Sequence, residues 1–261
     1  MPGNADELTI TPPFGYGEIA PLQKPDRVLL PASGSTPDFC RHINALAVSA
    51  SEFNVAARDY PLVFSSADDG ASFAPVAVLG IANNQNLFVS ESGEWEKGCY
   101  VPAFVRRYPF CISKLFVDGE ARTERLVCVV KAYVDSQGIT LFDGSGEATA
   151  QWQTIERMLQ NYEDDLDATA QMCAMLAKLD LFSQFKFEVM YEHKAMLTVQ
   201  GMYRIDESKL TALKPASLQA LVTKGLMGRV YAHMHSLERF GDLYARAEAK
   251  AARHTTATVI T

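Results

Sequence analysis

The stretch that decides the fold reads Ala57-Arg58-Asp59-Tyr60-Pro61-Leu62-Val63-Phe64, and a shorter version, Val105-Arg106-Arg107-Tyr108-Pro109-Phe110, follows it later in the chain. The residue before a proline avoids helical backbone geometry, so a helix that approaches Tyr60 or Tyr108 must end there. The apolar residues after each proline favour an extended strand. Each copy therefore predicts a helix end followed directly by a strand.

The sequence around these copies predicts short helices and short strands. Ser49-Ala50-Ser51-Glu52 has the pattern of a capping box, in which the first and last side chains satisfy backbone N–H groups at a helix start. The apolar run over 75–81 is typical of a buried central strand. Further strands are predicted at 17–22, 27–30, 62–64, 87–89, 110–116, 126–133 and 139–142.

The pattern changes after about residue 146. From Thr149 to about Leu181, apolar residues recur at steps of three and four, which predicts one long helix. Residues 185–191 and 196–203 alternate in part between apolar and polar, which favours a β-hairpin. The remaining predictions are a turn capped by Asp206, a helix from Pro215 to Lys224 ended by Gly225, and a last amphipathic helix over 228–253.

These elements predict an α+β fold: a mostly antiparallel N-terminal sheet with short helices, followed by a long helix, a β-hairpin and C-terminal helices. We expect a loose N-terminal arm over 1–16 and a frayed tail over 254–261. Between them we expect a single domain over 17–253, β-rich in 17–146 and helix-rich in 147–253.

Composition narrows the class of protein. The chain of 261 residues has a formal net charge of −7 and a pI near 5.3, which argues against a large nucleic-acid interface. Its five cysteines are scattered without a Cys-x-x-Cys pair, which is typical of reduced thiols in a cytosolic protein. The first residues lack the pattern of a signal peptide, and no apolar run is long enough to span a bilayer. We therefore expect a cytoplasmic protein, with a leaderless export route left open.

The candidate ligand-binding residues lie in the two copies: Arg58, Tyr60, Arg106, Arg107 and Tyr108. Two arginine forks near helix ends can bind a carboxylate or a phosphate. The structural alternative is that the arginines satisfy carbonyls at helix C-termini and the tyrosines pack beside the prolines. The Arg107→Ala variant distinguishes the two interpretations. It should abolish ligand binding with little loss of stability if Arg107 binds a ligand, and it should lower stability strongly if Arg107 is structural.

The histidines are weak candidates for a metal site. His233 and His235 are two residues apart on a predicted helix and do not face each other, so they need a further ligand. His193, with Glu188 and Glu192 near it in sequence, could supply nitrogen and oxygen ligands. The alternative makes His233 a hydrogen-bonded core residue and His235 a surface residue. We predict no metal and no cofactor.

Familiar catalytic motifs are missing from the sequence. It contains no Gly-x-Gly-x-x-Gly, phosphate loop, Gly-x-Ser-x-Gly elbow or His-Glu-x-x-His. These absences argue against a common nucleotide enzyme, serine hydrolase or zinc protease, but they leave an unfamiliar active site open. The sequence thus favours a protein that is not an enzyme, without deciding the question.

Several motifs occur in a fixed order around and between the two copies: Pro75-Val76-Ala77-Val78-Leu79-Gly80, Asn86-Leu87-Phe88-Val89, Gly93-x-Trp95, Tyr100-Val101-Pro102, Gly201-Met202-Tyr203-Arg204-Ile205-Asp206-Glu207 and Tyr231-Ala232-His233-x-His235-Ser236-Leu237. Together with the two copies, this set resembles the SapC family from about Tyr16 to Leu237. The resemblance therefore covers nearly the whole chain.

The resemblance implies a bacterial protein of unknown function. The family is named for a protein linked to a paracrystalline surface layer, and it is distinct from the peptide-transport permease with the same letters, which would need transmembrane helices. Its members are often encoded near genes for outer-membrane receptors, cupin-like proteins and flavin-halogenase-like proteins in Gram-negative bacteria. It offers no established catalytic residues to transfer.

The resemblance and the missing catalytic motifs lead to one main hypothesis. It is a non-enzymatic accessory or binding protein that acts with envelope or nutrient-uptake machinery through a protein or peptide partner. The alternative is an enzyme or small-molecule binder whose anionic ligand is held by Arg58, Arg106 and Arg107. A structural role in a surface layer is a third, less favoured hypothesis. No nucleic-acid partner and no membrane span are expected, and a homo-oligomer is left open.

Overall fold

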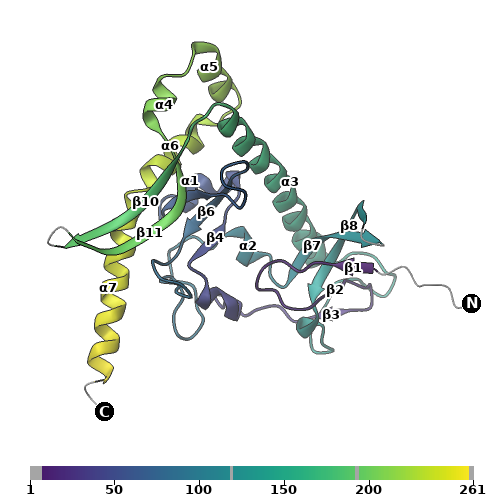
Figure 1. The fold of residues 1–261 in the computed structure, drawn as a ribbon. Helices are drawn as coiled ribbons and strands as arrows, with labels where there is room; N and C mark the ends of the chain where they lie inside the picture. The colour runs from purple at the N-terminus through teal and green to yellow at the C-terminus, as the bar shows by residue number, and fades with distance from the viewer. Residues whose placement is uncertain (1–7, 118–119, 192–193, 259–261) are drawn as a thin grey trace, which may run out of the picture. The chain divides into compact units, whose positions relative to one another are not determined.

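The computed structural model describes residues 8–117, 120–191 and 194–258 (Figure 1). The chain divides into two compact units. The first unit comprises residues 1–40 and 105–163, and the second comprises 41–104 and 164–261. The predicted single domain over 17–253 stays a prediction.

The first unit is built on antiparallel strands. Its larger sheet has the strand order β1-β7-β8-β2, and β3 pairs with β9 in a small second sheet. The strands are β1 (Leu8–Ile10), β2 (Ile19–Pro21), β3 (Arg27–Val28), β7 (Phe110–Val117), β8 (Glu120–Val130) and β9 (Ile139–Thr140). β1 lies within the segment for which a loose arm is expected, and it pairs with β7 from Leu8 opposite Val117 to Ile10 opposite Leu115.

The core of the first unit forms where this sheet meets the long helix α3 (Ala150–Lys178), whose residues up to 163 are counted with this unit. Its buried side chains are Val28, Phe110, Val129, Leu141, Trp152 and Leu159. The helix begins after Thr149, whose hydroxyl accepts a hydrogen bond from the Trp152 amide at 3.3 Å. The prediction of a long helix over residues 149–181 is therefore confirmed, to within three residues at its end.

The second unit contains a five-stranded antiparallel sheet with the order β10-β11-β5-β6-β4. Its strands are β4 (Ala45–Ala47), β5 (Leu62–Ser65), β6 (Ala74–Val78), β10 (Phe182–Tyr191) and β11 (Lys194–Ile205). The apolar run that predicted a central strand forms β6, which pairs with β5 on one side and β4 on the other. The sequence did not indicate that the C-terminal hairpin β10–β11 joins this sheet, which it does through Tyr203 opposite Phe64.

Short helices follow the predicted pattern. The chain forms 3-10 turns at η1 (Asp38–His42), η2 (Ala50–Glu52) and η3 (Lys131–Tyr133), and short helices at α1 (Phe53–Ala56), α2 (Ala103–Arg106), α4 (Glu207–Thr211) and α5 (Pro215–Thr223). The Ser49 amide donates to the Glu52 carboxylate at 2.7 Å, as a capping box requires. The two helix ends before Tyr60 and Tyr108 are confirmed, since α1 ends at Ala56 and α2 at Arg106.

Two local predictions are wrong. Residues 87–89 do not form a strand, and Val89 makes only an isolated bridge with Trp95. The helix predicted over 228–253 is divided into α6 (Met227–Ser236) and α7 (Arg239–Thr258). The interruption follows Ser236, whose hydroxyl donates to the His233 carbonyl at 2.6 Å and so competes with the helical backbone pattern. α7 extends into the segment 254–261, for which a frayed tail is expected.

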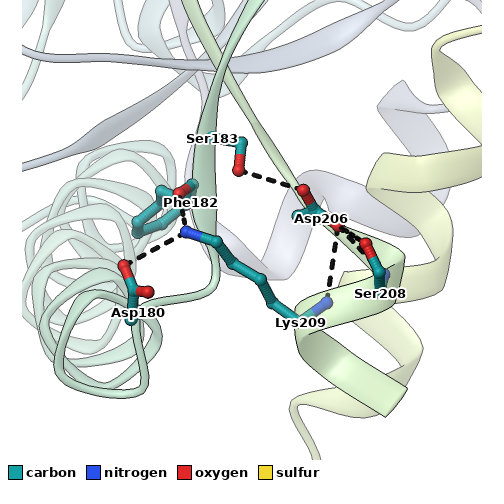
Figure 2. A network of polar contacts seen from close by, with 6 residues as sticks. All are labelled: Asp180, Phe182, Ser183, Asp206, Ser208 and Lys209. Atoms are coloured by element: carbon teal, nitrogen blue, oxygen red, sulfur yellow. Dashed lines mark hydrogen bonds and ion pairs between the residues drawn. The ribbon is translucent and has the colours of Figure 1, made fainter. Parts of the chain in front are cut away.

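A polar network fixes the base of the β10–β11 hairpin (Figure 2). Asp206 caps α4 by accepting from the Ser208 amide at 2.9 Å, and it also accepts from the Ser183 hydroxyl at 3.1 Å. Lys209 donates to the Asp180 carboxylate at 3.2 Å and to the Phe182 carbonyl at 3.0 Å. The hydrogen bonds from Ser208 and Ser183 lower the pKa of Asp206 to about 2. The predicted cap at Asp206 is therefore confirmed.

The fold class is also confirmed as α+β, with antiparallel sheets early in the chain and helices towards its C-terminus. Within the part of the chain that the structure describes, no helix has the length and apolar character needed to cross a membrane.

Candidate functional site

The second unit contains a cavity of about 820 Å³ between the segment 87–97 and helix α7. The segment contributes residues 87–91 and 94–97, and the helix contributes Arg246, Ala249 and Lys250. This volume lies within the range of small-molecule binding sites. Two of the motifs that resemble the SapC family, Asn86–Val89 and Gly93-x-Trp95, overlap this segment.

A tight turn shapes the segment. The Ser90 amide donates to the Glu94 carbonyl at 2.9 Å, and the Gly93 amide donates to the Ser90 carbonyl at 3.0 Å. Gly93 has a φ of 81°, which favours glycine, and a Cβ placed there would meet the Arg41 guanidinium at 2.9 Å. The turn therefore returns the chain so that Trp95 lies opposite Val89.

The floor of the cavity is aromatic and rests on Tyr60. The Tyr60 ring meets Phe88 edge to face at a centroid distance of 4.7 Å, and its hydroxyl accepts from Trp95 Nε1 at 2.9 Å. The same hydroxyl donates to the Tyr100 carbonyl. Burial raises the pKa of the Tyr60 phenol, so it stays neutral. Tyr60 thus holds the floor in place from below.

A buried carboxylate continues this polar chain behind the floor. Glu52 is 3 % exposed, and besides the Ser49 amide its carboxylate accepts from the Tyr100 hydroxyl at 3.0 Å and the Ala103 amide at 2.7 Å. The Tyr100 amide donates to Asp59 at 2.7 Å. Tyr100 and Ala103 are therefore joined to the helix start at Ser49 through Glu52. Because Glu52 accepts all of these hydrogen bonds, its carboxylate can be buried.

The wall of the cavity carries an arginine that lies across the floor. Arg246 is 4.5 Å from the centroid of Phe88, and both of its terminal nitrogens donate to the Glu96 carboxylate, one of them at 3.1 Å. Lys250, one turn further along α7, donates to the Asn86 carbonyl at 3.4 Å. The rim also carries Glu91, Glu94 and Lys97, so it presents charges of both signs.

The nearest thiol is not an activated nucleophile. Burial, followed by the charges of Glu96 and Asp59, raises the pKa of Cys99. A thiol with a raised pKa stays protonated at neutral pH and reacts slowly. Among the described residues, no group of three or more metal-binding side chains gathers here or elsewhere. The arrangement can hold a ligand by apolar contact and paired charges.

The predicted ligand-binding residues divide between the two units. In the second unit Arg58 is exposed, with its Nε donating to the Val55 carbonyl at 3.5 Å, whereas Tyr60 is fully buried beneath the cavity. In the first unit Arg106 is exposed, Arg107 is 5 % exposed, and Tyr108 is half-buried. A joint anion site at these five residues stays a prediction.

Arg107 lies among aromatic rings and next to a carboxylate. Its guanidinium carbon is 4.4 Å from the centroid of Tyr162 and 5.6 Å from that of Tyr16. It forms an ion pair with Glu163 at 3.6 Å, and Glu163 also binds Arg125 at 2.8 Å. Tyr108 packs edge to face against Tyr16 and Tyr133, at 5.0 and 5.1 Å.

The weak metal candidates have different environments. His233 is fully buried: its Nδ1 donates to the Leu62 carbonyl at 2.8 Å, and its Nε2 accepts from the Ile205 amide at 3.0 Å. His235 is exposed on the same helix. His193 and Glu192 lie outside the described residues. The core alternative proposed for His233 is thus confirmed by both of its hydrogen bonds.

At the end of the pairing between β5 and β11, His233 replaces the direct backbone hydrogen bonds between the two strands. Leu62 turns its amide and carbonyl away from β6, and α6 binds both: the amide donates to the Ser236 hydroxyl at 2.9 Å, and the carbonyl accepts from His233. In the register set by Tyr203 opposite Phe64, Ile205 would bind Leu62 directly. The imidazole instead stands between these two backbone groups and joins β5 to β11.

The family model named SapC matches residues 31–243, so the chain belongs to the SapC family. Neither the curated proteins nor the solved structures contain a match to this chain. The resemblance found from the sequence motifs is therefore confirmed.

Sequence reasoning missed the cavity. The segments that form its floor match motifs of the SapC family, but the motifs alone assign no role to Phe88 or Trp95. Arg246 and Glu96 are 150 positions apart, so no local pattern connects them. The available signal was the pair of aromatic residues on either side of the Gly93 turn, which a loop rarely needs unless it covers a core or a ligand.

Proposed function

We propose that this protein is a non-enzymatic binding protein that takes a peptide segment of a partner protein into the cavity between residues 87–97 and α7. The observation that supports this most is the combination of an aromatic floor, Phe88 and Trp95, with a rim that carries both carboxylates and cations. A peptide presents apolar side chains and charges of both signs within a few residues, which suits such a cavity.

The chemistry of the site supports binding over catalysis. Arg246 and Glu96 already neutralise each other, and the thiol of Cys99 has a raised pKa. The polar groups below the floor, at Tyr60 and Glu52, are engaged in hydrogen bonds within the protein. We propose that the partner belongs to envelope or nutrient-uptake machinery and that the protein acts in the cytoplasm, on the basis of the family resemblance.

The test fills the cavity without disturbing the core. Ala249 is exposed and lines the cavity, so Ala249→Trp places a large ring in the hollow while α7 retains its packing. Ala245 is also exposed on α7 but does not line the cavity, so Ala245→Trp is the matched control. Tagged wild type and both variants are captured from the native host at native expression and their partners quantified by mass spectrometry.

A partner that is stoichiometric with wild type and with Ala245→Trp, but lost with Ala249→Trp, supports the proposal. A synthetic peptide from that partner must then bind the purified wild type and not the Ala249→Trp variant. Capture of the same partner by all three proteins, or of no partner by wild type, overturns it.

A further inference from the structure

A second surface of the molecule is the outer edge of β10, which ends the five-stranded sheet of the second unit (Figure 1). Within the described residues no strand pairs with this edge, although β10 is ten residues long. A long edge strand presents a row of backbone donors and acceptors that favours pairing with another strand.

The backbone groups that face outwards belong to the even-numbered residues of β10. The Leu181 carbonyl accepts from the Asp206 amide of the neighbouring chain segment, so odd-numbered groups turn towards β11. The register shift after Phe185 advances β10 by two residues and β11 by three, and Gly201 adopts a φ of 79° there. The extra residue therefore lies in β11, and the alternation along β10 continues unbroken.

The two faces of β10 differ in the same alternating way. Phe185 and Phe187 are half-buried and pack on Phe240 of α7, with centroid distances of 5.6 and 4.8 Å. Lys186 and Glu188 lie on the opposite, exposed face and form an ion pair at 3.0 Å. An added strand must continue both the aromatic face and the charged face.

We propose that the partner of this edge is a second copy of the same chain, paired antiparallel along β10 with Phe187 opposite Phe187 of the other copy. In this register Lys186 of each copy lies opposite Glu188 of the other, so the two ion pairs form an alternating cluster of four charges. The outward backbone groups of these residues then bind each other in pairs. The contact is isologous, as in most closed dimers.

Charge selects this register over its neighbours. A twofold axis at residue 186 would place Lys186 opposite Lys186, and one at residue 188 would place Glu188 opposite Glu188. Like charges directly opposite in an antiparallel pair are unfavourable. The register centred on Phe187 also continues the apolar face, because it sets Phe185 opposite Val189.

The test is a charge-swap cycle on the full chain. Lys186→Glu and Glu188→Lys, made singly, each place like charges opposite one another twice in the dimer and leave the folded monomer intact, because both side chains are exposed on its surface. The double variant restores opposite charges in every pair. Sedimentation equilibrium of the purified protein over a range of concentrations measures the dimer dissociation constant.

We expect each single variant to weaken the dimer by about tenfold or more and the double variant to return close to wild type. A mixture of the two single variants should dimerise close to wild type, because Lys186→Glu carries two negative charges on this edge, Glu188→Lys carries two positive charges, and both pairs of the mixed dimer are then oppositely charged. A wild type that stays monomeric at all concentrations overturns the proposal. A dimer that none of the variants affects overturns it equally, because its interface then lies elsewhere.

Discussion

The two copies of the Arg-x-Tyr-Pro motif have similar sequences, but one copy buries its tyrosine and the other buries an arginine. In the second unit the phrase at 57–61 buries Tyr60 completely and leaves Arg58 exposed. In the first unit the phrase at 105–109 buries Arg107 and leaves Tyr108 half-buried. Proline and the apolar residues after it determine where the helix ends and the strand begins. They do not determine which side chain faces the interior, because that depends on neighbours far away in sequence.

The neighbours of the two copies explain the difference. Tyr60 finds Phe88 and the Trp95 indole, so both its ring and its hydroxyl are satisfied in the interior. Arg107 finds the ring of Tyr162 and the carboxylate of Glu163, so a cation can be buried. Substitutions at the two tyrosines, at His233 beside the first copy's strand, and at the arginines test this difference.

The largest expected effect is at the first copy's tyrosine. Tyr60→Ala removes a fully buried ring from beneath Phe88 and Trp95, and we expect it to cost about 3–5 kcal/mol of unfolding free energy. Tyr108→Ala, at the half-buried equivalent position, is expected to cost about half as much. Urea denaturation of both variants measures the difference. Equal costs would mean that the two tyrosines do the same structural work.

Acid should weaken the strand after the first copy. Burial lowers the pKa of His233 from 6.5 to about 4, so the folded state holds this imidazole neutral while the unfolded state protonates it. Its contribution is fully present above pH 6.5 and falls as the pH drops from 6.5 through 4, by on the order of 3 kcal/mol in total. A protonated imidazole also cannot accept from the Ile205 amide.

Unfolding free energies measured by urea at several pH values between 7.5 and 4.5 check this. The control is His235→Asn, which changes an exposed histidine on the same helix and should leave the decline as it is. His233→Gln should begin less stable and lose the decline. An unchanged pH dependence in His233→Gln would assign the acid sensitivity to other groups.

The smallest effects separate the arginines. Arg107→Ala leaves Glu163 with Arg125 but removes the stacking on Tyr162, and we expect a loss of about 2 kcal/mol. Arg58→Ala is expected to change stability by less than about 0.5 kcal/mol, since this side chain is exposed. Arg107→Lys keeps the charge without the planar stacking and should fall between them. Melting temperatures rank the three variants. An Arg107→Ala variant as stable as wild type would favour the predicted anion site over a structural role.

Local patterns predicted the parts of the fold that local physics determines. The capping residues Ser49 and Asp206, the period of α3 and the stop before Pro61 all act within a few residues of themselves. The sequence could not predict that β11 joins β5, because that junction combines the pairing of Tyr203 with Phe64 and a bridge through His233 on a third segment. It missed the cavity for the same reason, since Arg246 reaches the floor from the far end of the chain.

The histidine between β5 and β11 has a consequence for how the protein is made. The strands β4, β5 and β6 are synthesised before α6. Until the chain has emerged from the ribosome as far as Ser236, the Leu62 backbone groups have neither His233 nor Ser236 to bind, and this border of the sheet stays open. The chain emerges N-terminal end first at roughly 5–20 residues per second, so this border is exposed for about ten seconds or longer during each round of synthesis. We expect truncated chains that end before α6 to be the aggregation-prone products of interrupted translation.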